Sequence, residues 1–205
     1  MTRDDLLAAS RGGMLFSTPM VRALLADQKT RTMRVVKPKL LHWGECNTCN
    51  ESELIRFLVE HARYKPGDII YVRETWQDYP PTPPSPKTFY FYKADDEYPN
   101  AADKWRPSLF MPKAAARIFV RFTAITAQRP QALTGDEILA EGVPCPAGRE
   151  QGLCVSACSD CWVLRHRWET LWDSLRSKKD MPVYGYAADP LCFVYGLERM
   201  VPDAE

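Results

Sequence analysis

Five separated segments of the sequence favour β-strands, because they alternate apolar with polar residues or are rich in β-branched and aromatic residues. They are Thr30–Val36, Ile69–Val72, Thr88–Lys93, Ala116–Ala127 and Cys192–Met200. Turn-forming residues separate them, and the five prolines within residues 79–86 exclude a central strand or a helix there. The pattern predicts an α+β fold, namely a small, mostly antiparallel β-barrel flanked by short helices.

The helices are expected where apolar residues recur every three or four positions. These segments are Pro19–Ala26, Leu54–His61, Thr134–Glu141 and Trp162–Ser177, and the last would place Trp168 and Trp172 in the core. Thr134 and Glu137 have the spacing of a capping box, and Gly142 supplies the stop. Leu40–Asn50 is predicted to be a loop.

Length and charge narrow the class of protein. The 205 residues suit one domain over 14–205, with a Cys-rich insertion at about 143–161 and a flexible extension over residues 1–13. We expect a cytoplasmic protein with no membrane partner, because no apolar run approaches the roughly 20 residues of a membrane span and residues 1–13 have no signal-peptide core. The net charge of +1 leaves only a local basic patch for nucleic acid.

Five blocks of the sequence, in this order, resemble the ASCH-domain proteins of phages and prophages, which belong to the PUA-like superfamily. They are Met14–Pro38, Tyr64–Trp76, Trp105–Lys113, Leu133–Gly142 and the ending around Leu171–Ser174. The resemblance extends over nearly the whole chain and implies a PUA-like barrel. It says less about activity, because one fold hosts many functions.

The family has a cleft motif of the form G-x-K-x-x-(E or T)-x-R, and the segment Asp27–Arg34 reads DQKTRTMR. Asp27 replaces the usual glycine, and Thr32 is similar to the branch whose members are amidohydrolases acting on N4-acylated cytidines, such as N4-acetylcytidine. That resemblance implies a catalytic triad of Lys29, Thr32 and Glu141. Two other positions depart from phage relatives, since Phe110 and Ala114 stand where those often have His and Trp.

The chemistry of such a triad is plain. A threonine hydroxyl becomes a nucleophile when a base accepts its proton, and a desolvated lysine can be that base. A glutamate can orient the lysine or carry a proton to the leaving amine. On the residues alone a simpler arrangement is favoured, in which Lys29 and Arg34 are solvated charges, Thr32 is an ordinary strand residue and Glu141 is an exposed acid at a helix end.

Basic and aromatic residues recur beside the same elements, and a subset of them is expected to bind substrate. This subset is Arg34, Arg73, Trp76, Trp105 and Arg106. Stacking on tryptophan and pairing of phosphate with arginine would suit a modified nucleoside or a single-stranded nucleic acid. The alternative is a solvated basic rim around tryptophans that belong to the core.

Seven cysteines give a separate signal, because clustered cysteines in a reducing compartment favour metal over disulfides. Two C-x-x-C pairs predict one structural Zn²⁺ held by Cys46, Cys49, Cys158 and Cys161. A competing local set replaces the first pair with Cys145 and Cys154. His42 and His166 are possible substitute ligands, unpaired thiols are the further alternative, and Cys192 is expected in the core.

The sequence therefore predicts hydrolysis of an amide on an acylated nucleoside, without an organic cofactor. Two other functions stay open. One is a PUA-like module that binds RNA or a modified base without chemistry, and the other is a zinc-stabilised phage accessory protein with a protein partner. Convergence of Lys29, Thr32 and Glu141 in a water-poor site would favour the enzyme. The oligomeric state is not indicated.

Overall fold

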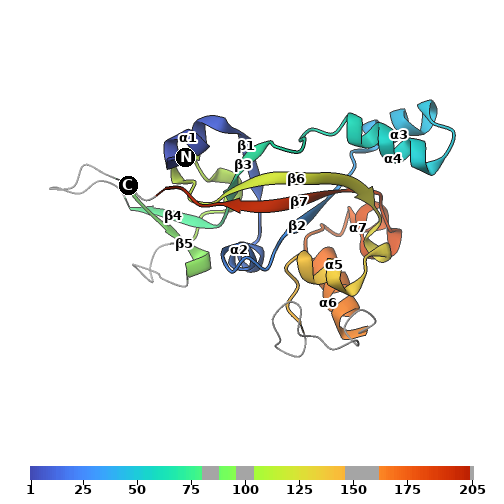
Figure 1. The fold of residues 1–205 in the computed structure, drawn as a ribbon. Coiled ribbons are helices and arrows are strands. Elements are labelled where there is room, and N and C mark those ends of the chain that lie inside the picture. Colours follow the sequence, from blue (N-terminus) through green and yellow to red (C-terminus); the bar gives the residue numbers. More distant parts are fainter. Residues whose placement is uncertain (80–87, 96–103, 146–161, 204–205) are drawn as a thin grey trace. The chain divides into compact units, whose positions relative to one another are not determined.

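The computed structural model describes residues 1–79, 88–95, 104–145 and 162–203 (Figure 1). The α-helices are α1 (Arg3–Ala9), α2 (Thr18–Leu25), α3 (Pro38–Asn47), α4 (Glu51–Glu60), α5 (Gly135–Ala140), α6 (Trp162–Ser174) and α7 (Met181–Tyr184). The strands are β1 (Ser10–Leu15), β2 (Arg31–Val35), β3 (Ile69–Arg73), β4 (Trp76–Tyr79), β5 (Phe89–Tyr92), β6 (Phe119–Gln128) and β7 (Cys192–Met200). The expected α+β class is confirmed.

The main sheet has five strands in the order β1-β3-β6-β7-β2. Strand β1 pairs with β3 in parallel, whereas β3 pairs with β6 and β2 pairs with β7 in antiparallel registers, so the sheet is mostly antiparallel as predicted. Within the described residues β1 and β2 are the two ends of this order, and no closed barrel is found.

Strand β5 corrects one detail of the prediction. We expected Thr88–Lys93 in the same sheet as the other strands, but β5 pairs with β4 in a separate two-stranded sheet. The aromatic alternation of this segment identified a strand without indicating its partner. Its partner β4 was not predicted.

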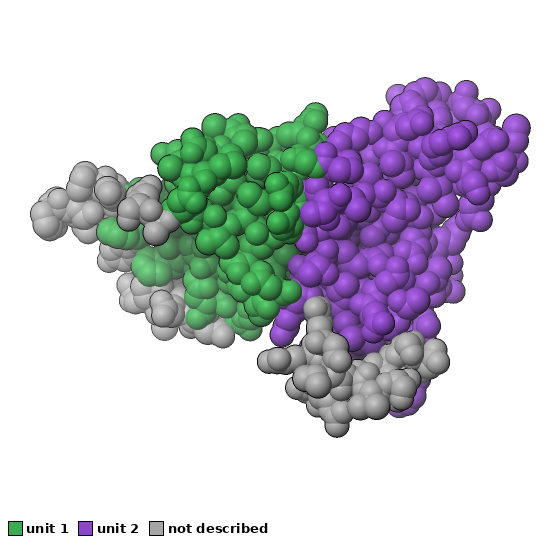
Figure 2. All heavy atoms as spheres, in the orientation of Figure 1, with its two compact units in different colours: residues 1–27, 67–121, 198–205 green, residues 28–66, 122–197 purple. Residues whose placement is uncertain are grey.

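The chain divides into two compact units (Figure 2). Unit 1 comprises residues 1–27, 67–121 and 198–205, and unit 2 comprises residues 28–66 and 122–197. The boundary falls within β6 and within β7.

The first residues of unit 1 differ from expectation, because α1 and β1 stand where we expected a flexible extension over residues 1–13. Thr2 caps α1 through a capping box with Asp5, and Leu6 is fully buried. We expected no regular structure here because the segment is mostly polar. Gly13 serves a close approach, since a Cβ there would lie 2.6 Å from the Arg73 side chain and 2.7 Å from that of Tyr71.

In unit 2, the segment predicted as a loop over Leu40–Asn50 contains α3, which contacts α4. Gly44 lets the two helices approach, because a Cβ there would lie 2.6 Å from the Leu54 side chain. Trp43, Phe57 and His61 pack their rings at this contact, with centroids 4.2 to 4.8 Å apart.

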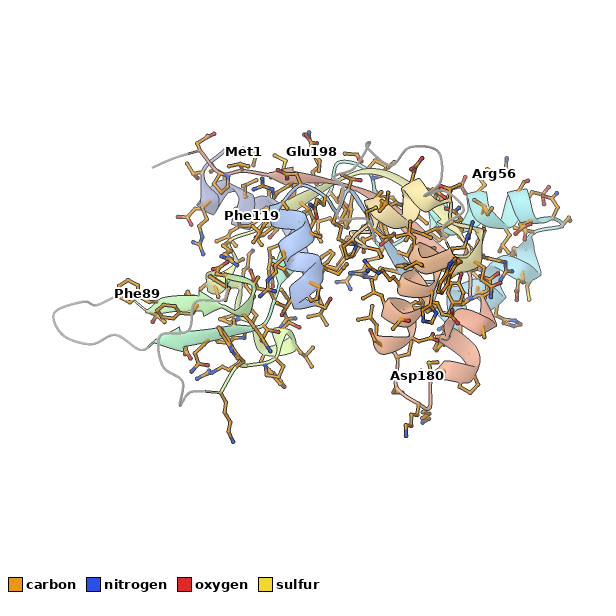
Figure 3. All side chains as sticks on the ribbon, turned by 90° about the horizontal axis from the view of Figure 1, so that it is seen from below. Met1, Arg56, Phe89, Phe119, Asp180 and Glu198 are labelled. Carbon is orange, nitrogen blue, oxygen red and sulfur yellow. The ribbon has the colours of Figure 1, made fainter. Side chains whose placement is uncertain are left out.

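Each unit has a core of its own. In unit 2, Met33 and Cys192 pack with residues of α5 and α6, including Trp168 and Trp172, so the core positions predicted for both tryptophans and for Cys192 are confirmed. In unit 1, Phe119, which is labelled in Figure 3, packs with Leu6, Trp76 and Met111. No helix within the described part of the chain is long and apolar enough to cross a membrane.

Candidate functional site

A buried ion pair in unit 2 joins two residues that are 112 positions apart. Lys29 Nζ lies 3.0 Å from Glu141 Oε2 and donates a second hydrogen bond to the Glu141 carbonyl oxygen at 2.6 Å. Lys29 is 5% exposed and Glu141 is 3% exposed. Two of the three residues predicted to be catalytic are therefore in direct contact and away from solvent.

The backbone explains this contact. The Thr30 N–H donates to the Ala140 carbonyl at 2.9 Å, which sets Lys29 beside Glu141. Glu141 is the C-cap of α5, and Gly142 follows with a φ of 88°, the left-handed conformation that glycine adopts without strain. The predicted capping box is present at the other end of α5, where Thr134 and Glu137 cap reciprocally.

The surroundings change the proton affinity of the lysine. Burial lowers the pKa of Lys29 below its ordinary value of 10.5, and this outweighs the opposing attraction to Glu141. The positive charges of Arg34 and Arg31 lower the pKa further. A neutral amine therefore forms at a lower pH than it would on a solvated lysine, as a general base requires.

The third predicted residue, Thr32, lies on β2 and is 1% exposed. Its Oγ1 accepts a hydrogen bond from Arg34 Nη1 at 2.8 Å. The contact follows from strand geometry, because residues two apart project from the same face. Sequence reasoning assigned Arg34 to substrate and missed this pairing, although the period of two could have revealed it. Arg34 connects the site, since it holds Thr32 while its charge acts on Lys29 and Glu141.

Arg31 is a second residue whose role the sequence did not reveal. Its Nη1 donates to Glu137 Oε1 at 2.6 Å and its Nη2 donates to Gln128 Oε1 at 3.0 Å. Its Nε lies 3.7 Å from Glu141 Oε1, and both of these buried atoms are without a hydrogen-bond partner among the described residues. Glu141 thus offers Lys29 one oxygen and keeps the other available as an acceptor.

Aromatic residues lie beside the Thr32 hydroxyl. Tyr195 of β7 is paired in register with Thr32, and its ring packs against Phe122 and Tyr64 at centroid distances of 4.8 and 6.1 Å. Burial raises the pKa of Tyr195 to about 12, so the phenol stays protonated. This side of the site is apolar and keeps water away from β2.

Asp27, which stands where the family's cleft motif has a glycine, has a φ of 54°. Few residues other than glycine adopt this left-handed conformation, and aspartate is among those that tolerate it. Its carboxylate accepts two hydrogen bonds of 2.7 Å from Arg199, which lower the pKa of Asp27. The backbone therefore has the shape that a glycine would favour.

The other residues expected to bind substrate, Arg73, Trp76, Trp105 and Arg106, all belong to unit 1. Trp76 is buried in the core of that unit, with Arg106 over its ring at 5.2 Å, so the core alternative describes this tryptophan. Arg106 forms an ion pair with Asp78 at 2.8 Å, and Arg73 donates to the Leu109 carbonyl. Trp105 is half-buried.

Unit 1 also contains a buried ion pair that the sequence did not indicate. Glu74 accepts two hydrogen bonds from Arg117, at 2.9 and 3.0 Å, and Arg117 reaches Asp95 at 2.7 Å. The guanidinium lies 3.9 Å from the centre of the Tyr92 ring. Glu74, Arg117 and Asp95 are thus paired with one another within unit 1. We therefore assign this network to the fold of unit 1.

Of the four predicted zinc ligands, Cys46 and Cys49 are among the described residues, whereas Cys158 and Cys161 are not. Cys46, in the last turn of α3, and Cys49, just beyond it, are exposed thiols. Cys154, Cys158 and Cys161 lie outside the described residues, as does most of the insertion over 143–161. His42 Nε2 is 3.8 Å from Cys46 Sγ. Within the described ranges no group of three or more potential ligands gathers, so the zinc site stays a prediction.

We expect purified protein to contain one zinc per chain, because the exposed Cys46–Cys49 pair is open to a second C-x-x-C pair. Replacing both Cys46 and Cys49 by serine should remove the metal, measured by elemental analysis, whereas Cys192→Ala should retain it because that thiol is in the core. Zinc well below one per chain in the wild type would contradict the prediction. Retention in the double variant would favour Cys145, Cys154, Cys158 and Cys161.

Comparison of the chain with protein-family models, with curated proteins and with solved structures gives no match.

Proposed function

We propose that the chain is an ASCH-type, cytoplasmic amidohydrolase that removes the acyl group from an N4-acylated cytidine. The observation that carries the proposal is the buried pair of Lys29 and Glu141, in which burial lowers the pKa of the lysine. A lysine that acts as a general base needs such a lowered pKa. The left-handed backbone at Asp27, where the family motif has glycine, supports the resemblance.

In the first half-reaction, the Thr32 Oγ attacks the acyl carbonyl carbon and its proton passes to the neutral Lys29 amine, directly or through one water. Arg34, which donates to this oxygen, stabilises negative charge as it develops. The carbon–N4 bond then breaks, and the leaving amine takes the proton back from Lys29. The products of this half are cytidine and an acyl ester on Thr32.

In the second half-reaction, water attacks the ester while Lys29 again accepts a proton, which releases the carboxylic acid and restores the hydroxyl. Glu141 holds the ammonium each time it forms, through Oε2. Its second oxygen, buried and without a hydrogen-bond partner among the described residues, is suited to accept the N4–H of the substrate.

A binding module without chemistry is the second candidate. It is favoured by the two hydrogen bonds from Lys29 Nζ to Glu141, since a carboxylate in contact favours the charged lysine. In that case the pair would serve only to shape a pocket for the base.

A panel of nucleosides separates the candidates. Purified protein is incubated with N4-acetylcytidine, with longer N4-acyl homologues and with N4-methylcytidine, which has no amide. We expect the acyl compounds to yield cytidine and the acid in equal amounts by chromatography, and the methyl compound to stay intact. Binding of N4-acetylcytidine without turnover would establish the module and reject the hydrolase.

A further inference from the structure

A surface pocket of about 310 Å³ in unit 2 borders the end of β2, the strand that carries Thr32. It is lined by Val35, Val36, Lys37, Pro38, Leu175, Arg176, Asp180 and Tyr184. These residues come from the end of β2, the start of α3, the segment after α6 and the end of α7. Asp180, which is labelled in Figure 3, lies at the turn before α7.

This pocket contains two cations, Lys37 and Arg176, and the charges of Asp173 and Asp180 act on Arg176. Arg176 donates through Nε to the Tyr184 carbonyl at 3.3 Å and lies over the Trp172 ring at 4.5 Å, so the side chain is held in place. Among the described residues, no ion pair involves Lys37 or Arg176. The carboxylate in the lining, Asp180, accepts from Ser177 Oγ at 2.7 Å. The lining therefore has two positive charges and one negative charge.

The pocket is linked to the site both in distance and in charge. Val36, directly after β2, follows Thr32 by four residues, a separation of about 13 Å along an extended chain, and the even spacing places it on the face of Thr32 and Arg34. Arg34 lies between them in sequence, and the charge of Arg176 contributes to the lowered pKa of Arg34, whose first cause is burial. An anion in the pocket would thus lie along β2 from Thr32 and close to the charge of Arg176.

We infer that this pocket binds the 5′-phosphate of a nucleoside monophosphate, so that the substrate of the proposed hydrolase is a nucleotide rather than a free nucleoside. A guanidinium fixed by stacking presents its terminal nitrogens to phosphate oxygens, and a flexible lysine adds a second charge. The apolar part of the lining, with Val35 and Pro38, leaves room for the ribose. The inference rests on the proposed function for the identity of the base.

The test compares cytidine, its 5′-monophosphate and its 3′-monophosphate by calorimetric titration, with inorganic phosphate as the smallest probe. We expect wild type to bind the 5′-monophosphate at least about tenfold more tightly than cytidine, and to bind inorganic phosphate weakly. The double variant Lys37→Met, Arg176→Met should lose the preference. Lys37→Met alone should lose part of it, and because Lys37 is exposed this variant keeps its fold. Lys179→Met, an exposed lysine outside the pocket, is the matched control and should keep the preference.

Equal affinity for cytidine and the 5′-monophosphate, a preference for the 3′-monophosphate, or a preference that survives the double variant would overturn the inference. The two proposals fail separately. Turnover of N4-acetylcytidine and its 5′-monophosphate at equal kcat/KM would leave the hydrolase and reject the phosphate site. A phosphate preference without turnover of either compound would leave the site and reject the hydrolase.

Discussion

Replacing Thr32 by alanine is expected to abolish hydrolysis of N4-acetylcytidine, with kcat/KM reduced by at least about a thousandfold. The hydroxyl is the proposed nucleophile, and neither the lysine nor Arg34 can form the acyl ester in its place. The measurement is release of cytidine under substrate-limited conditions. The substitution removes one hydrogen bond from Arg34, which should lower the free energy of unfolding by only about 1 kcal/mol.

The matched control is Thr30→Ala. Thr30 is exposed and acts in the fold through its backbone, whose N–H and carbonyl bond to Ala140 and Leu197, so the alanine variant should keep full activity. A Thr32→Ala protein that is folded and as active as wild type would show that Thr32 is not the nucleophile. An equal loss of activity in Thr32→Ala and Thr30→Ala would show that the substitutions disturb β2, and not that the nucleophile has been removed.

Replacing Lys29 by methionine is expected to remove activity and to destabilise the fold by about 3–5 kcal/mol, because Glu141 keeps a buried charge without its partner. Adding Glu141→Gln removes that charge as well. The double variant should be less destabilised than the sum of the single changes, and denaturant unfolding measures the difference. The variant Lys29→Arg distinguishes the role of Lys29 as a base from its role in the ion pair with Glu141. A guanidinium keeps the positive charge but gives up no proton. This variant should be inactive while it recovers part of the stability.

The pH dependence has a definite sign. Because burial lowers the pKa of Lys29, the unfolded chain binds more protons than the folded one between the folded pKa and 10.5. The free energy of unfolding therefore rises with pH through this window, and the penalty of burying a charge is fully present below it. The kcat/KM should rise with pH with a midpoint below 10.5, as the amine loses its proton. A kcat/KM that is flat across this range would contradict the role of Lys29 as base.

Much of the fold could be predicted from local pattern. The bounds of β7 match the prediction for Cys192–Met200, and the capping box of α5 is present as the Thr134–Glu137 spacing indicated. The predictions of secondary structure were wrong at two places where a glycine allows another element to approach closely. Gly13 in β1 and Gly44 in α3 each make room for a side chain from another element. Such a contact is tertiary, and no local pattern contains it.

The candidate site was predictable in part. On a continuous strand Lys29 and Thr32 would project from opposite faces, so spacing alone gave no reason for Lys29 to approach the site. The hydrogen bond from Thr30 to Ala140 supplies the reason, and it joins segments more than a hundred residues apart. The resemblance to the family indicated Glu141. The hydrogen bond from Arg34 to Thr32 was missed, although it follows from the two-residue period of a strand.

The pairing of β2 with β7 has a consequence for synthesis on the ribosome. Lys29 and Thr32 leave the exit tunnel more than a hundred residues before Glu141, and the strand that pairs with β2 spans Cys192–Met200. At about 5–20 residues per second, several seconds pass in which β2 has an unpaired edge. The two basic residues of β2, Arg31 and Arg34, discourage pairing with a neighbouring nascent chain during this interval. The same guanidiniums that later serve the site can thus act as gatekeepers against aggregation.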